Sequence, residues 1–182
     1  MDKLIDDLKI WLSKDSVSNI FENNKNLHCQ FRNIFQFQQY QFLKLVNDPL
    51  LAAVVGEIGN NSFDHNFAKW KDIFGVVFVY DIEKRIVIIA DRGQGIKTTL
   101  LNVKPNIQND EEAVKMAFMQ VISGRAPEQR GNGLKFSASV AKARGWNLFL
   151  QSGNGCAIID LGKMEFKSNA SIVKGCLTII KY

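Results

Sequence analysis

The sequence has few cysteines and no long apolar run. Its three cysteines, Cys29, Cys156 and Cys176, are scattered, odd in number and not spaced as metal ligands are. We therefore expect reduced thiols rather than a disulfide framework. No apolar segment approaches the roughly 20 residues that a membrane-spanning helix needs. The first residues, MDKLIDDLKIWLSKD, mix acids and lysines with apolar residues and lack the order of a signal peptide. These absences predict a cytoplasmic protein with no membrane partner.

A concentrated basic cluster is also missing. The chain carries 23 Lys and Arg residues against 18 Asp and Glu residues, a formal net charge of +5, and the excess is spread along the sequence. No cluster of basic residues is interleaved with aromatics, so the composition does not favour nucleic acid as a partner. The mild positive charge suits an anionic small ligand, such as a nucleotide, equally well.

The pattern of apolar residues predicts a single α+β architecture of 182 residues. Helical spacing is found over 3–13, 29–46, 49–67, 110–122 and 134–145, although the second of these could begin as a strand. Runs rich in β-branched and aromatic residues predict strands over 75–81, 85–91, 146–153, 156–162 and 176–182. Residues 92–110 and 123–133 are predicted to be loops. We expect a two-layer domain, its helices on one face of a mostly antiparallel sheet.

The stretch GEIGNNSFDHN, residues 56 to 66, is unusual for a helix that begins in an apolar run. At 3.6 residues per turn, Glu57, Asn60, Asn61 and Asp64 share one face, while Leu51, Val55 and Ile58 share another. A solvated surface is the ordinary explanation of a polar helix face. Asn, Asp and Gly are poor helix formers, however, and Gly56 and Gly59 suggest that something approaches the backbone closely. Amide and carboxylate oxygens suit magnesium, so the stripe predicts a metal-phosphate site.

Two glycine-rich segments add to this prediction. In ADRGQGI, Asp91 ends a strand, where its carboxylate could accept a hydrogen bond from an exocyclic amine such as that of adenine. Gly93 and Gly95 follow and leave room for a flat base, although a plain turn would have the same pattern. In QRGNGL, Arg130, Gly131, Asn132 and Gly133 come just before a predicted helix that begins at Leu134. Such a loop leaves free N–H groups at the start of the helix, which would favour phosphate.

These three elements, in this order, resemble the motifs of the GHKL ATPases, a superfamily that includes gyrase-type topoisomerases, histidine kinases and the ninety-kilodalton heat-shock chaperone. The segment ExxxNSxDH, from Glu57 to His65, is similar to the N box of that family, and DRGQGI and RGNGL are similar to its two glycine boxes. The resemblance covers residues 50–182. Its layout is closest to the stand-alone anti-sigma-factor serine kinases.

The resemblance implies a Bergerat α/β sandwich over residues 49–182, with residues 1–48 as a helical extension packed on it. It implies that ATP or ADP binds with Mg²⁺, that Asn61 holds the metal with help from Asn60, and that Glu57 is the general base. Asp91 would read adenine, and residues 97–130 would form a lid. The nucleotide-binding set would be Asn60, Asn61, Asp64, Asp91, Gly93, Gly95, Ile96, Arg130, Gly131, Asn132, Gly133 and Leu134.

Two features depart from the family pattern. Many members have Gly-Thr before the last strand, where this sequence has Gly175 and Cys176. No phosphoacceptor segment is recognisable, because His28 lacks the usual acidic neighbour, so sensor autophosphorylation is not expected. Three functions stay open: a stand-alone ATP-dependent protein kinase or ATPase with a protein partner, a nucleotide-dependent binding module without turnover, and a nucleic-acid-linked ATPase subunit. Residues 1–48 would serve dimerisation or partner docking.

Overall fold

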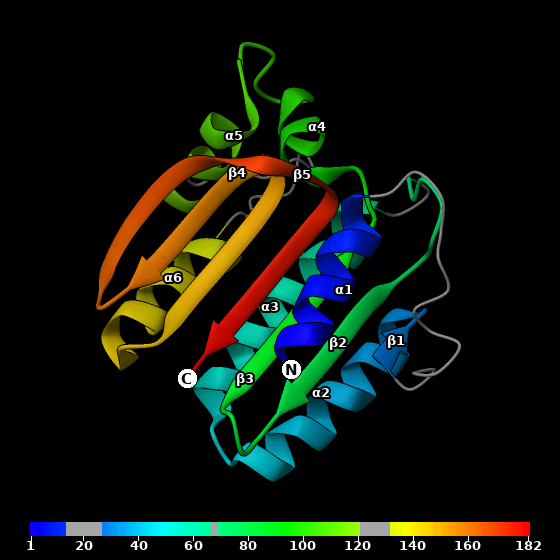
Figure 1. Cartoon of the computed structure of the whole chain (residues 1–182), viewed down its shortest axis with the longest axis vertical. Coiled ribbons are helices and arrows are strands. Elements are labelled where there is room, and N and C mark those ends of the chain that lie inside the picture. The colour runs from blue at the N-terminus through cyan, green and yellow to red at the C-terminus, as the bar shows by residue number, and fades with distance from the viewer. Residues whose placement is uncertain (14–26, 67–68, 121–131) are drawn as a thin grey trace.

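The computed structural model describes residues 1–13, 27–66, 69–120 and 132–182, and Figure 1 shows its helices and strands. Within these ranges the elements are α1 (Asp2–Ser13), β1 (His28–Cys29), α2 (Arg32–Val46), α3 (Pro49–Asn66), β2 (Val76–Asp81), β3 (Ile86–Asp91), α4 (Gly95–Leu101), α5 (Asp110–Met119), α6 (Gly133–Arg144), β4 (Asn147–Asp160) and β5 (Lys163–Lys181). None of the helices in the described part of the chain could span a bilayer.

The strands form one five-stranded sheet in the order β1-β2-β3-β5-β4, and every neighbouring pair is antiparallel. The α+β class predicted from the sequence is therefore confirmed. β2 and β3 form the expected hairpin, in which Val77 pairs with Ala90 and Tyr80 with Val87. The final strand in the sequence, β5, lies between β3 and β4 and holds the two halves of the sheet together. It places Cys176 opposite Asp91.

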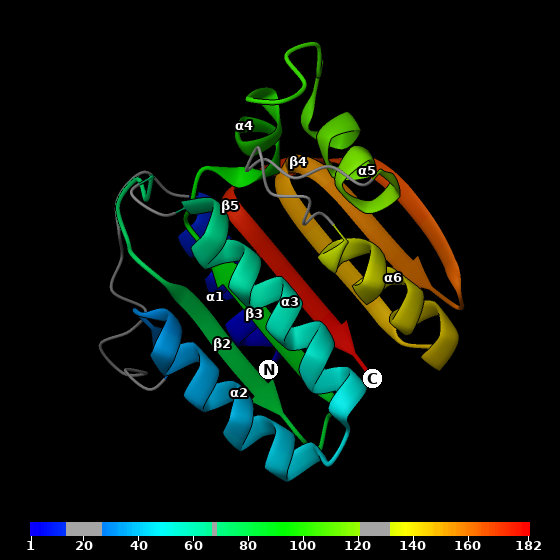
Figure 2. The ribbon, with the colours of Figure 1, turned by 180° about the vertical axis from the view of Figure 1, so that it is seen from behind.

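Both faces of the sheet are buried at β2 and β3, which explains the nearly continuous apolar runs of these two strands. Val76, Phe78, Val87 and Ile89 pack against the helices α2, α3 and α6. The residues that alternate with them pack against Leu8, Trp11 and Leu12 of α1. Figure 2 shows α2, α3, α5 and α6 on one side of the sheet, and Figure 1 shows α1 on the other. The expectation that all helices share one face is therefore wrong for α1.

The C-terminal region forms two long strands, where the sequence predicted three shorter ones. Residues 146–153 and 156–162 were expected to be separate because Gly153 and Gly155 interrupt the apolar pattern. In the structure the ladder continues through these glycines with two register shifts, at Ser152/Gly153 and Gly153/Gly155. The glycines therefore mark bulges within β4. A hydrogen bond of 3.0 Å from the Asn154 N–H to Asp110 Oδ2 fastens the start of α5 to this bulge.

The segment 92–110, predicted to be a loop, contains the helix α4. Gly95 supplies a positive φ of +80° where the chain enters the helix. The Thr99 hydroxyl donates to the Gly95 carbonyl at 2.9 Å. Leu100 packs with Ile107 and Ala113 in a small cluster shared with α5. The lid expected over 97–130 therefore begins with two packed helices, and residues 121–130 lie outside the described ranges.

Gly56 and Gly59 have a different purpose from the one the sequence suggested. A Cβ at Gly59 would lie 2.0 Å from Cζ of Phe35, and a Cβ at Gly56 would lie 2.3 Å from Nε2 of Gln39. Both glycines thus face α2 and not a ligand. The Gln39 side chain also donates to the carbonyl of Ala52 at 2.8 Å. The glycines allow α2 to pack closely against α3, which fixes the first turn of α2 beside the last turns of α3.

Candidate functional site

A cavity of about 570 Å³ lies between α3, the sheet, α4 and the start of α6. This volume is within the range of small-molecule sites. The cavity brings together ten of the thirteen residues that the sequence nominated: Glu57, Asn60, Asn61, Asp64, Asp91, Gly95, Ile96, Asn132, Gly133 and Leu134. Gly93 lies beside it, under Asn66, and Arg130 and Gly131 fall outside the described residues. Apolar walls come from Ile58, Ile89, Leu100 and Leu150.

At one end of the cavity, Asp91 is held in a network of hydrogen bonds. Its carboxylate accepts from the Ser62 hydroxyl at 2.7 Å, from the Gly93 N–H at 2.8 Å and from Asn66 Nδ2 at 3.3 Å. Asp91 is only 2% exposed. Burial raises the pKa of Asp91, while the bonds from Ser62, Gly93 and Asn66 act to lower it. The network therefore holds the carboxylate in one orientation beside the cavity and favours its charged form.

Cys176 is the neighbour of Asp91 in the sheet and lines the same end of the cavity. Burial, followed by the charge of Asp91, raises the pKa of its thiol, so the thiol stays protonated at neutral pH. The thiol group is therefore an apolar wall rather than a nucleophile. Thr178 lines the cavity two residues further along β5. At Cys176 the cavity wall thus carries a side chain that is only a weak hydrogen-bond donor.

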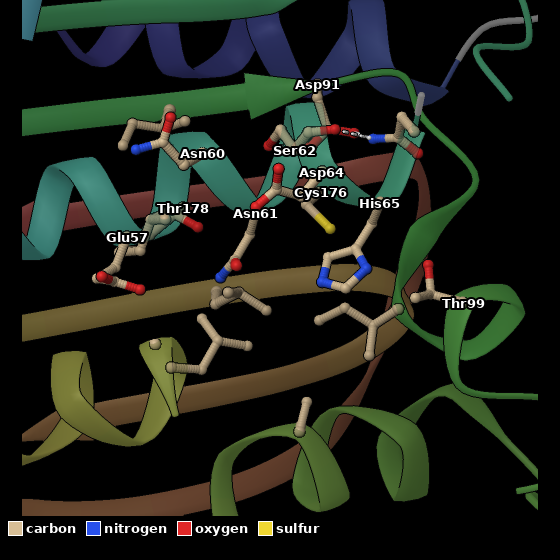
Figure 3. A pocket seen from close by; sticks show the side chains of 18 of the residues that line it. Glu57, Asn60, Asn61, Ser62, Asp64, His65, Asp91, Thr99, Cys176 and Thr178 are labelled. Carbon is tan, nitrogen blue, oxygen red and sulfur yellow. Dashed lines mark hydrogen bonds between the residues drawn. The ribbon is translucent and has the colours of Figure 1, made fainter. Parts of the chain in front are cut away.

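A second group of polar side chains projects from α3 toward the start of α6. Figure 3 shows Glu57, Asn61 and His65 on this side of the helix, one turn apart. A Cβ at Gly133 would lie 2.5 Å from Glu57 Oε2 and 3.4 Å from Asn61 Nδ2, so the first residue of α6 approaches both groups. The Glu57 carboxylate is exposed and no described residue donates a hydrogen bond to it. It is therefore accessible to a ligand in the cavity.

Asn60 and Asp64 are on the neighbouring edge of the same helix. Oδ1 of Asn60 is buried and has no hydrogen-bond partner among the described residues. An unpaired buried oxygen costs free energy, so this atom calls for a partner that a bound ligand or cation could supply. Asp64 forms an ion pair with Arg32, the first residue of α2. The four polar residues predicted to share one face of the helix all line the cavity, but Glu57 and Asn61 point toward α6, whereas Asn60 and Asp64 lie on another side.

The donor set fits magnesium bound together with phosphate. The described residues contain no group of three or more His, Cys, Asp or Glu side chains that could hold a metal without other ligands. Magnesium usually takes only one or two protein groups and completes its shell with phosphate oxygens and water. The Asn61 amide, on the side of α3 that faces Gly133, provides such a group in the cavity and is the residue that would hold the ion. Asn60 also lines the cavity, but its side chain lies on another side of the helix (Figure 3), so the help expected from it is not evident in this arrangement.

Sequence reasoning assigned no role to Ser62, Asn66 or Arg32. Ser62 and Asn66 are one helical turn apart and follow Ile58 on the side that faces the sheet, so their spacing is a usable signal. Arg32 gives no such signal, because it comes from a helix outside the motif match and reaches the cavity only through packing. Comparison of the sequence with protein-family models finds no matching family, and comparison with curated proteins finds no match.

Proposed function

We propose that this protein is a GHKL-type adenine-nucleotide-binding domain with a Bergerat fold, and that it acts as an ATP-dependent protein kinase or ATPase. The observation that carries the proposal is the position of Asp91. Its buried carboxylate lies at the end of β3, is held by Ser62 and Asn66 of α3, and opens on the same cavity as Glu57 and Asn61. The helix α3 thus connects Asp91, a group suited to binding a nucleobase, with Asn61, a group suited to the phosphate end of a nucleotide.

The chemistry assigned to each end follows from these residue types. At the first end, the Asp91 carboxylate accepts a hydrogen bond from the exocyclic amine of adenine, whereas the carbonyl oxygen of guanine would be repelled. At the second end, Asn61 would hold Mg²⁺, which when bound neutralises charge on the phosphate oxygens. Glu57 is placed to orient or deprotonate a water molecule or a substrate hydroxyl, the role of a general base.

A second function is a nucleotide-dependent binding module that does not turn over ATP. The outer face of α2 favours it, because Ile34, Phe37 and Leu45 are 39%, 60% and 60% exposed there, together with Phe31 at the start of the helix. Large apolar side chains grouped on one exposed helix face are typical of protein-protein contacts. The two functions share the nucleotide site and differ in whether Glu57 acts on a bound molecule.

Calorimetric titration tests the shared site. We expect Mg-ATP and ADP to bind and GTP to bind much more weakly. Asp91→Asn keeps the shape of the side chain but presents an amide, so the affinity for adenosine should fall about tenfold or more, as for loss of a hydrogen bond to a charged group. Equal affinities of wild type and Asp91→Asn for adenosine would refute the assignment of Asp91. Circular dichroism of both proteins verifies that folding is unchanged.

A further inference from the structure

The helix α2 contributes to the cavity although it precedes every motif of the nucleotide site. Arg32 and Gln36 line the cavity, and they are one turn apart on the side of α2 that faces α3. Packing at Gly56 and Gly59 brings the two helices together in antiparallel order, Gln39 beside Gly56 and Phe35 beside Gly59. The same progression leads one turn further to Arg32 beside Asp64. The position of Arg32 is therefore set by the helix-helix contact.

The guanidinium of Arg32 is held on one side only. Its Nη2 donates to Asp64 Oδ1, and its Cζ lies 5.8 Å from the centre of the Phe63 ring. The Arg32 side chain is 41% exposed, and the Asp64 side chain is 18% exposed. No described residue accepts a hydrogen bond from its remaining N–H groups. Arginine has five N–H donors in a planar fork that matches phosphate oxygens, so the group has donors to spare for an anion.

The charges of the described cavity lining favour such a group. Its described lining contains the carboxylates of Glu57, Asp64 and Asp91, and Arg32 is the only Lys or Arg side chain among these lining residues. Three carboxylates would repel a nucleotide triphosphate, even one with a single bound Mg²⁺, unless cationic groups balance them. The phosphates carry the negative charge of a nucleotide, so they are the part that a guanidinium in this position favours most.

We propose that Arg32 is a phosphate-binding residue of the nucleotide site and that Asp64 is its positioning residue. This inference rests on the proposed function, because it assigns one further group to the same cavity. Arg32 donates to the phosphate oxygens through the N–H groups that Asp64 leaves available. Asp64 keeps the guanidinium at the wall of the cavity and does not bind the nucleotide itself. The role predicted for Asp64 from the sequence, a direct nucleotide contact, is thereby reassigned.

The test compares ligands that differ only in phosphate. Calorimetry measures the affinities of wild type, Arg32→Ala and Arg32→Lys for Mg-ATP, ADP and adenosine. Arg32→Ala should lower the affinity for Mg-ATP and ADP by about tenfold or more, the effect of a charge-assisted hydrogen bond, and leave adenosine affinity unchanged. Arg32→Lys should recover part of the loss, because it retains the charge without the fork. Raising the salt concentration should reduce the difference in Mg-ATP affinity between wild type and Arg32→Ala.

A matched control is available in the same chain. Arg144 pairs with Asp48 at 3.7 Å, with side-chain exposures of 46% and 25%, and neither residue lines the cavity. Arg144→Ala therefore removes a similar ion pair at the other end of the helices, and nucleotide affinity should not change. Asp64→Asn should reduce Mg-ATP affinity less than Arg32→Ala does, because the guanidinium loses its support but remains present.

Four other results would each contradict a specific part of the proposal. If Arg32→Ala binds Mg-ATP as wild type does, Arg32 does not bind phosphate. If Arg32→Ala and Asp64→Asn weaken adenosine and Mg-ATP equally, the pair only supports the packing of α2 on α3, and the proposal is wrong. If wild type binds adenosine at least as tightly as it binds Mg-ATP, the site has no favourable phosphate contact. If wild type binds none of the three ligands, the proposed function itself fails.

Discussion

The Ser62 hydroxyl donates a hydrogen bond of 2.7 Å to Oδ2 of Asp91 and so joins α3 to the end of β3. Both side chains are buried. Because of this bond, the position of the Asp91 carboxylate, where adenine is proposed to bind, depends on α3, the helix that also carries Glu57 and Asn61. Because the hydroxyl acts against the effect of burial on the pKa of Asp91, Ser62 also helps to keep the carboxylate charged.

Ser62→Ala should weaken adenosine binding by up to about tenfold, because Asp91 loses a donor that orients its carboxylate and opposes the rise in its pKa. The remaining donors, the Gly93 N–H and Asn66, would hold the carboxylate less firmly. Calorimetry with adenosine measures the effect. Ser139→Ala serves as control, since Ser139 is exposed on α6 and does not line the cavity. An unchanged affinity in Ser62→Ala would show that the bond does not prepare Asp91 for a ligand.

Adenosine affinity should decrease on acidification, with a midpoint above the ordinary Asp pKa of about 3.9, because burial raises the pKa of Asp91. Protonation turns the charged carboxylate into a neutral carboxyl group, which is a weaker acceptor for the amine. Adenosine is the suitable ligand, since it has no phosphate that titrates. The effect on folding has the opposite sign: an acid with a raised folded pKa makes the fold less stable as pH rises from the unfolded pKa toward the folded one. A binding curve that stays flat down to the ordinary Asp pKa would contradict the assignment.

Glu57→Gln should retain Mg-ATP affinity and lose turnover by about a hundredfold or more, the usual contribution of a general base. The reason is that Glu57 is exposed to the cavity and is not part of the Asp91 network. Phosphate release, or phosphate transfer to a protein recovered with this one from its native host, provides the measurement. Glu83→Gln, in the exposed turn between β2 and β3, is the control. If wild type consumes no ATP with any candidate partner, the binding-module function replaces the enzyme.

Gly59→Ala should destabilise the fold by about 1–3 kcal/mol, as overpacking of a core does, although Ala favours helices more than Gly. The added methyl group would overlap the Phe35 ring, whose nearest atom lies 2.0 Å from the Cβ position. Urea unfolding gives the free energy change. Phe35→Leu, which removes part of the ring, should reduce the cost of Gly59→Ala in a double-mutant cycle. Additive effects of the two substitutions would contradict direct contact as the cause.

Periodicity predicted the elements whose burial follows a simple pattern. β2, β3 and α3 were expected within one or two residues of their observed bounds, because β2 and β3 are runs of β-branched and aromatic residues and α3 begins in a clear apolar run. α4 was missed since it is only seven residues long, begins at the second glycine of a turn-like segment and contains two β-branched threonines. It is supported by contacts of Leu100 with Ile107 and Ala113. The sequence wrongly divided β4 into two strands, because glycines mark a bulge and the end of a strand in the same way. Only pairing with β5 distinguishes them.

The site was predictable where its residues share one helix face, and not where packing assembles it. Glu57, Asn61 and Asp64 have a spacing that can be found in the sequence, and Asp91 ends a clear strand. By contrast, the purpose of Gly56 and Gly59 depends on which neighbour lies against them. That neighbour, α2, also brings Arg32 to the cavity. Local spacing contains no information on contacts between separate helices, so these assignments required the structure.

The central place of β5 in the sheet has a consequence for folding. The strand that completes the wall beside Asp91 comes after all other described elements in the sequence, yet it must insert between β3 and β4. Pairing across such a sequence separation closes a long loop and is slow compared with local helix or hairpin formation. A ligand that requires the Asp91 pocket can therefore bind only after this last insertion, and it would stabilise the completed sheet over any partly folded form.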